Sequence, residues 1–117
     1  MERVREIIAY KDYFEVFFEK QTEKVKAKIH KILNLIEYQQ IIPSKYFKHI
    51  EGTNGLYEAR ISLGSDIWRV FCFFDEGRLV ILLNGFQKKS QKTPQSEIEK
   101  ELRLMTEYYN EKKGNKR

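Results

Sequence analysis

The sequence predicts a single α+β domain with an N-terminal strand, a helical hairpin, a three-stranded antiparallel meander and a C-terminal helix. Two stretches before Pro43 carry apolar residues at helical spacing, and a third such stretch follows Pro94. Between them, three strand-like stretches are separated only by short turns, which permit antiparallel neighbours and exclude parallel crossovers. A chain of 117 residues has room for one hydrophobic core, so residues 1–117 are expected to form one domain.

The chain is expected to open with a short strand followed by an aromatic helix. Residues 4–9 are rich in valine and isoleucine, which favours a strand, and we place it at an edge of the sheet. Asp12 and Glu15 have the spacing of a capping pair at a helix start. The aromatic side chains that follow share one helix face: Phe14, Phe17 and Phe18.

A longer helix follows, with Thr22 as its N-cap residue. Its apolar stripe consists of Val25, Ile29, Ile32, Leu33 and Ile36. The lysines at its other positions are better explained as a solvated polar face than as a nucleic-acid contact. Pro43 ends this helix, because proline lacks an amide donor and disfavours helix in the residue before it. The connection from Pro43 to Gly55 is expected to be a loop, whose Lys48 and His49 would line a cleft if it folded back over the sheet.

Three strand-like stretches form the predicted meander: residues 56–63, 67–74 and 79–87. Side chains alternate between the two faces along each strand, and this alternation makes Arg60 and Arg69 charges within otherwise apolar, adjacent strands. The unbroken apolar run from Leu79 to Leu83 indicates a strand that is covered on both faces. We therefore expect this run at the centre of the sheet.

The last helix is predicted to have Thr93 as its N-cap and Pro94 as its first helical residue. Its apolar stripe consists of Ile98, Leu102, Met105 and Tyr109. The acidic residues near its start suit the positive end of the helix dipole: Glu97, Glu99 and Glu101. Residues 111–117 are polar and basic, and they are expected to fray.

The composition indicates a basic protein of a reducing compartment. The 22 basic residues outnumber the 17 acidic ones, and the resulting formal charge of +5 favours a polyanionic partner. Cys72, the sole cysteine, lies in an apolar run and is expected to be a small buried residue rather than a catalytic thiol. A phosphate loop, a nucleophile elbow and a zinc-spaced Cys and His cluster are all missing, so we expect neither cofactor nor metal. Without a membrane-length apolar segment or a signal peptide, a cytoplasmic location is expected.

Four cationic residues near one another on successive predicted strands form the candidate site: Arg60, Arg69, Lys88 and Lys89. An antiparallel meander can bring such positions within reach of one another, and clustered cations repel unless an anion lies among them. One interpretation is therefore an anion site. The other is that Arg60 pairs with Glu58 or Asp66, while the lysines cap an exposed strand end.

A phosphodiester suits the first interpretation, because arginine can donate two parallel hydrogen bonds to phosphate oxygens. Cleavage of RNA by its own 2′-hydroxyl builds negative charge at phosphorus, which fixed cations would stabilise. A lysine whose pKa is lowered by cationic neighbours could transfer the proton. This chemistry needs no metal.

Three motifs, spread over most of the chain, carry a family resemblance: residues 56–60 (LYEAR), residues 68–75 (WRVFCFFD), and residues 84–94 (NGFQKKSQKTP) running into Glu97 and Ile98. These residues resemble the RelE/ParE superfamily of bacterial toxins, specifically its HigB-like, phage-derived branch. The resemblance implies a RelE-like fold with the order of elements given above. It also implies a toxin that cleaves messenger RNA, usually in the ribosomal A site, and that is kept silent by a cognate antitoxin encoded next to it.

The same resemblance implies roles for residues at matching positions. Arg60 and Arg69 look like the phosphate-contacting strand residues of the family, and Lys88 and Lys89 look like its basic residues after the final strand. We regard these four as the catalytic candidates. Contacts to RNA are assigned to a further set: Tyr57, Lys48, His49, Gln91 and Lys92.

Two positions depart from the family pattern. Glu58 stands where well-studied relatives have a lysine, and Gln95 lies about where they have a catalytic tyrosine. The general acid and base therefore stay open among four residues: Lys89, Lys92, Tyr57 and His49.

The leading hypothesis is a ribosome-dependent endoribonuclease that inhibits translation, with messenger RNA and an antitoxin as its partners. One alternative is a ParE-type toxin that blocks DNA gyrase without catalysis, since one fold serves both functions. The other is a basic nucleic-acid-binding module without toxicity. Mapping the ends of messages in a translation reaction would separate the first two, because a gyrase inhibitor leaves RNA whole.

Overall fold

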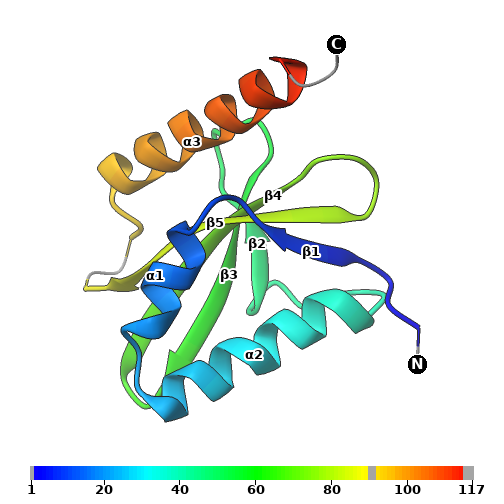
Figure 1. Cartoon of the computed structure of the whole chain (residues 1–117). Coiled ribbons are helices and arrows are strands. Elements are labelled where there is room, and N and C mark those ends of the chain that lie inside the picture. Colours follow the sequence, from blue (N-terminus) through cyan, green and yellow to red (C-terminus); the bar gives the residue numbers. More distant parts are fainter. Residues whose placement is uncertain (1, 90–91, 115–117) are drawn as a thin grey trace.

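Five strands and three helices make up the computed structural model, which describes residues 2–89 and 92–114 (Figure 1). In chain order, the elements are β1 (Glu6–Ala9), α1 (Tyr13–Glu19), α2 (Glu23–Tyr38), β2 (Phe47–His49), β3 (Leu56–Leu63), β4 (Asp66–Phe74), β5 (Leu79–Lys88) and α3 (Gln95–Gly114). The structure confirms the predicted α+β class and order of elements, and it adds strand β2. Every helix within the described ranges is too short or too polar to cross a bilayer.

The five strands form one mixed sheet in the order β1-β5-β4-β3-β2. Strands β3, β4 and β5 form the predicted antiparallel meander, and β1 lies at an edge, as predicted, parallel to β5. The expectation that residues 79–83 form the central strand is wrong, because β4 occupies the centre. Residues Val80, Ile81, Leu82 and Leu83 are nevertheless at most 3% exposed, since β1 covers the outer edge of β5 and helices cover its faces.

The connection from Pro43 to Gly55 contains the unpredicted strand β2. It pairs antiparallel with β3, so that Phe47 lies opposite Ala59 and Lys48 lies opposite Glu58. Three residues are too few to display the alternation by which a strand is recognised in a sequence. The buried ring of Phe47 anchors this segment in the core. The connection thus folds back along the sheet instead of leaving it as a loop.

Each face of the sheet carries its own hydrophobic core. One face packs against α1 and α2 through residues that include Phe17, Ile29, Ile36, Ala59, Val70 and Cys72. The other packs against α3 through residues that include Leu56, Phe71, Phe73, Ile81, Ile98 and Leu104. Figure 1 shows α2 and α3 on opposite sides of the sheet. The predicted alternation along β3 and β4 is therefore confirmed, and it assigns every second residue of these strands to the side of α3.

The first two helices differ in how they are capped. The side chain of Thr22 accepts a hydrogen bond from the amide of Val25 at 3.3 Å, which confirms its predicted role. The predicted capping pair at Asp12 is wrong: within the described chain its side chain makes no capping hydrogen bond. Capping residues have extended backbone, as Thr22 has, whereas Asp12 lies at φ −110° and ψ 12°.

Helix α1 lies against β5, where Gly85 leaves room for the ring of Phe17. A Cβ atom at position 85 would lie 2.6 Å from Cδ2 of Phe17, which is closer than packed carbon atoms approach. Phe14 and Phe18 are partly buried beside Phe17. The predicted aromatic face of this helix is confirmed, and the glycine explains how it comes so close to the strand.

Helix α3 begins one residue later than predicted. The carbonyl of Pro94 accepts hydrogen bonds from the amides of Glu97 and Ile98, whereas the hydroxyl of Thr93 donates to Glu58 instead of capping the helix. At its other end the helix continues through Gly114. Residues 111–114 of the predicted frayed tail are therefore helical, and residues 115–117 lie outside the described part.

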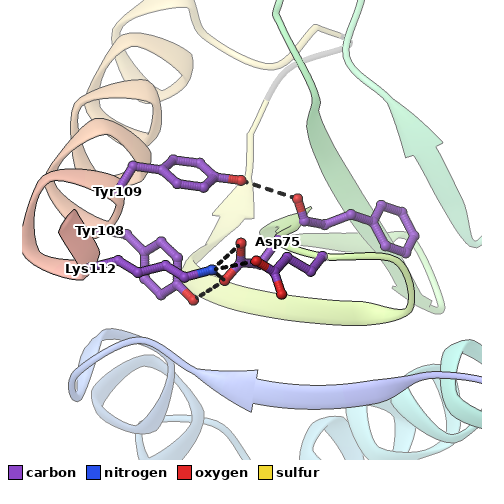
Figure 2. Close-up of polar contacts among 6 residues, drawn as sticks. Asp75, Tyr108, Tyr109 and Lys112 are labelled. Carbon is purple, nitrogen blue, oxygen red and sulfur yellow. Dashed lines mark hydrogen bonds and ion pairs between the residues drawn. The ribbon is translucent and has the colours of Figure 1, made fainter. Parts of the chain in front are cut away.

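The C-terminal half of α3 is fastened to the turn between β4 and β5 by a cluster of polar side chains (Figure 2). Lys112 Nζ lies 2.9 Å and 2.8 Å from the two carboxylate oxygens of Asp75, and the hydroxyl of Tyr108 donates to Oδ2 of the same residue at 2.5 Å. Tyr109 donates to the carbonyl oxygen of Phe74. The Asp75 side chain is 3% exposed, so these bonds form in a largely desolvated environment, where they are strong.

A second polar cluster holds the same half of α3 to the segment after β1. The hydroxyl of Tyr10 donates to Glu107 at 2.7 Å and also contacts Glu111. Lys11 Nζ lies 2.7 Å from Glu107. Helix α3 is thus anchored on two sides at its C-terminal half.

Glu101 lies in the core, whereas the sequence assigned it only a favourable interaction with the dipole near the helix start. It is fully buried between Ile98 and Leu104 on the face of α3 that meets the sheet. Its Oε1 accepts a hydrogen bond from the amide of Asn84 at 2.9 Å, while Oε2 has no partner among the described residues. Burial raises the pKa of Glu101 to about 7, although the Asn84 amide opposes the shift.

We predict that Glu101→Gln reduces the pH dependence of the free energy of unfolding. Between the ordinary pKa of 4.5 and about 7, the folded state keeps a proton on this carboxyl that the unfolded state releases. The group's contribution to stability is therefore complete below pH 4.5 and is lost as the pH rises through about 7. Urea unfolding should show the variant gaining about 2–3 kcal/mol relative to wild type at about pH 8 compared with about pH 5. A difference between the two proteins that does not change with pH would contradict this.

Candidate functional site

Strands β3, β4 and β5 place three cationic side chains on the side of the sheet that faces α3. Arg60 of β3 is the register partner of Arg69 of β4, so the two side chains lie on the same face of adjacent strands. Arg69 in turn lies opposite Phe86 of β5, and Lys88 follows two residues later on the same face. The meander therefore brings together three of the four predicted catalytic residues.

Two of these cations share one carboxylate, that of Glu58. Oε2 of Glu58 lies 3.3 Å from Nε of Arg60 and also 3.3 Å from Nε of Arg69. The other oxygen accepts a hydrogen bond from the hydroxyl of Thr93 at 3.1 Å. The side chains of Arg69 and Glu58 are 5% and 9% exposed, whereas that of Arg60 is 28% exposed. The alternative that Arg60 pairs with Glu58 is thus correct in part, but Arg69 competes for the same group.

The site keeps an excess of positive charge. Among the described residues, Glu58 is the carboxylate that pairs with either arginine, so Arg60, Arg69 and Lys88 are opposed by one negative charge. Burial lowers the pKa of Arg69, and Arg60 lowers it further against the opposing effect of Glu58. Burial also lowers the pKa of Lys88, and the positive charges of Arg69 and Arg60 lower it further. Both pKa values fall because burial and neighbouring positive charges disfavour the charged form of each side chain.

A cleft of about 460 Å³ lies beside this group of charges. Strand β2 and the segment leading into α3 contribute to its walls, and its lining includes Lys48, His49, Glu58, Lys88, Lys92 and Thr93. Three of the residues predicted to contact RNA are therefore here: Lys48, His49 and Lys92. Gln95 also lines the cleft. It lies about where the family resemblance leads one to expect a tyrosine.

The structure places the other predicted site residues elsewhere. Tyr57 lies on the opposite face of β3, where its ring stacks on Phe47 with centroids 5.0 Å apart and packs against the core under α1 and α2. Lys89 follows the last residue of β5 and is exposed. Gln91 lies outside the described residues. Cys72 is fully buried, and burial raises the pKa of its thiol, which agrees with a structural role.

Glu58 and Thr93 belong to the site but were not predicted to do so. Glu58 was considered as an ion-pair partner of Arg60 and as a departure from the family pattern, but not as a partner of Arg69, and Thr93 was assigned to the helix cap. The signal for Glu58 was present, because it lies two residues before Arg60 and therefore on the same strand face. Thr93 reaches it from a distant part of the chain, which a local pattern cannot reveal. Within the described ranges, no group of three or more Asp, Glu, His or Cys side chains is placed to hold a metal ion.

Comparison with known protein families shows which family the chain belongs to. The model of the family described as phage-derived protein Gp49-like (DUF891) matches residues 16–106, which is 91 of 117 residues. The chain belongs to the Gp49-like family. The match begins within α1, continues through most of α3 and includes all the residues of the site. A search of curated proteins found no match.

In this Gp49-like protein, we predict that Arg69→Ala is much more destabilising than Arg60→Ala. Removing Arg69 leaves the buried Glu58 carboxylate with the partly exposed Arg60 alone and should lower the free energy of unfolding by about 3 kcal/mol. Removing Arg60 should cost about 1 kcal/mol or less, because its charge is partly solvated and Arg69 remains. Urea unfolding of both variants measures the difference. Equal losses, or a larger one for Arg60→Ala, would contradict the observed sharing of Glu58.

Proposed function

We propose that this protein is the toxin of a type II toxin–antitoxin system and that it cleaves messenger RNA on the ribosome. The observation that carries the proposal is the convergence of Arg60, Arg69 and Lys88 on one strand face, opposed by a single carboxylate and bordered by a basic cleft. Membership of the Gp49-like family supports it, since that family is associated with RelE-like and other toxin-like proteins. The HigB-like branch is the closer assignment that we propose from the motifs.

In the reaction we propose, the 2′-hydroxyl gives up its proton and its oxygen attacks the neighbouring phosphorus, which forms a cyclic phosphate and breaks the bond to the 5′-oxygen of the next nucleotide. That oxygen leaves after it takes up a proton. Negative charge develops on the non-bridging oxygens, and the guanidinium groups of Arg60 and Arg69 would donate hydrogen bonds to them. One well-placed donor of this kind supplies on the order of 3 kcal/mol of transition-state stabilisation. Arg60 is the more accessible of the two and would meet the phosphate first.

Lys88 is the residue best suited to transfer a proton in this site. Burial and the two arginines lower its pKa, so it releases a proton more readily than a solvated lysine. Lys89, the fourth catalytic candidate, is exposed after the end of β5 and would contribute positive charge to the site. Lys48 and Lys92 would contact the nucleotides on either side of the cleaved bond from the cleft walls. His49 also lines the cleft, but its ring packs against Tyr57, its register partner on β3.

The partners proposed here are the messenger RNA in the ribosomal A site and an antitoxin encoded next to the toxin. The protein would act in the cytoplasm, where its target is translated. An antitoxin that covers the basic cleft would neutralise the toxin directly, and an acidic segment would suit the charge of the cleft.

The test is a translation reaction with purified components in which the 5′ ends of the message are mapped. The wild-type protein should produce new ends within the coding region, and Arg60→Ala should reduce their formation by roughly a hundredfold or more. Arg60→Ala is preferred to Arg69→Ala because it leaves the buried ion pair of Arg69 and Glu58 in place. Lys24→Ala is the matched control, since it removes the same charge from an exposed position on α2.

Intact message in the presence of folded wild-type protein would rule out the nuclease. Inhibition of DNA gyrase by the same preparation would then favour the ParE-type alternative. Equal cleavage by wild type and Arg60→Ala would contradict the placement of the reaction at this site, even if the protein proved to be a nuclease.

A further inference from the structure

The carboxylate of Glu58 occupies the position in which the proposed site would hold a phosphate. It lies between the guanidinium groups of Arg60 and Arg69 and is 3.3 Å from the Nε atom of each. With this carboxylate in place, the Arg69 side chain is 5% exposed, so an external anion cannot reach both arginines at once. The site is therefore filled by a group of the protein itself.

Glu58 is an imperfect partner for both arginines. Despite the short distances, the Nε atoms of Arg60 and Arg69 are buried and make no hydrogen bond within the described part of the chain. Two guanidinium groups thus share one carboxylate oxygen, each at 3.3 Å and in a geometry that is poor for hydrogen bonding. A phosphate presents several oxygens around one centre and can accept hydrogen bonds from both planar groups. Exchange of the carboxylate for a phosphate would satisfy donors that Glu58 leaves unsatisfied.

Thr93 holds Glu58 in this position. Its hydroxyl donates to Oε1 of Glu58 at 3.1 Å, on the side away from the oxygen that faces the arginines. Thr93 lies two residues before the start of α3, so displacement of Glu58 would break the direct hydrogen bond between β3 and the segment leading into that helix.

We propose that Glu58 is an internal competitor for the anion site, and that a phosphodiester of RNA binds by displacing its carboxylate from between Arg60 and Arg69. This inference rests on the proposed function, because it assumes that RNA is the anion. Glu58 would then set the affinity of the site for anions. It would also restrict the site to ligands that can accept hydrogen bonds from both arginines. Loss of its charge should strengthen phosphate binding, whereas a residue that merely oriented the arginines would weaken binding when lost.

The experiment measures binding of a short, fully 2′-O-methylated RNA oligonucleotide, which has no free 2′-hydroxyl and cannot be cleaved. Glu58→Gln should bind it roughly tenfold more tightly than wild type at the same moderate salt concentration. The matched control is Glu15→Gln, which removes the same charge from an exposed position on α1, on the other face of the sheet. The control should change the affinity less than about twofold.

Thr93→Val provides a second variant that keeps all charges, in case Glu58→Gln does not fold. It removes the hydroxyl that holds Glu58 and should tighten binding roughly threefold. Circular dichroism and thermal unfolding identify a variant that has lost its fold. Unchanged or weaker binding by folded Glu58→Gln or Thr93→Val would overturn the inference. Tightening by Glu15→Gln to the same extent as Glu58→Gln would also overturn it, because the effect would then be one of general charge.

The outcome is separable from that of the proposed function. If the variants bind the uncleavable oligonucleotide more tightly while wild type leaves messages intact, the competitor role of Glu58 holds and the nuclease fails. If wild type cleaves messages at the Arg60 site but Glu58→Gln binds no more tightly, the nuclease holds and the competitor role fails.

Discussion

The alternation of side chains along β3 and β4 is the constraint on which both the core and the candidate site depend. One face of these strands is apolar along its length and packs under α1 and α2. The face toward α3 changes character along the strands, from Leu56 and Phe73 beneath the helix to Arg60 and Arg69 beyond it. The register that builds the core therefore also places two guanidinium groups side by side. Glu58 lies between these two groups and reduces the repulsion between their charges.

Helix α3 connects the two parts of that face. Its C-terminal half is held by two polar clusters, one around Asp75 and one around Tyr10, while Glu101 is buried in its middle. Just before its first turn, Thr93 reaches Glu58 in the site. A helix held firmly at its C-terminal half, and linked to the site near its start by the hydrogen bond from Thr93 to the Glu58 carboxylate, can keep its core packing while the contacts of Glu58 change. This arrangement suits a site whose internal anion must leave before a ligand binds.

Much of the fold followed from local patterns because those patterns reflect burial. The helical stripes, the Thr22 cap and the meander were predicted correctly, since each is specified by residues close in sequence. What could not be predicted depended on distant contacts. Strand β2 exists because Phe47 enters a core built by other elements, and Glu101 looks like an ordinary solvated helix residue until the helix is placed on the sheet. The Asp12 cap failed because backbone conformation, which the sequence does not display, decides whether a side chain can reach the helix amides.

The candidate site was predictable to a similar degree. Arg60, Arg69 and Lys88 share a face as strand alternation required, and Lys48 and His49 line the cleft because the connection before β3 folds back. Tyr57 carried the resemblance to known toxins but lies on the other face, one residue out of phase with Glu58. The sharing of Glu58 by two arginines was the feature that no single-strand pattern contained, because it requires the register between strands and the position of Thr93.

Both proposals require that Arg60 and Arg69 act together as one phosphate-binding site. An NMR titration can follow the side-chain Nε–Hε resonances of both arginines as an uncleavable 2′-O-methylated RNA is added. Both resonances should shift together, with the same saturation, as the phosphate replaces the Glu58 carboxylate. Shifts confined to exposed lysines of α2, with both arginine resonances unchanged at saturation, would contradict it.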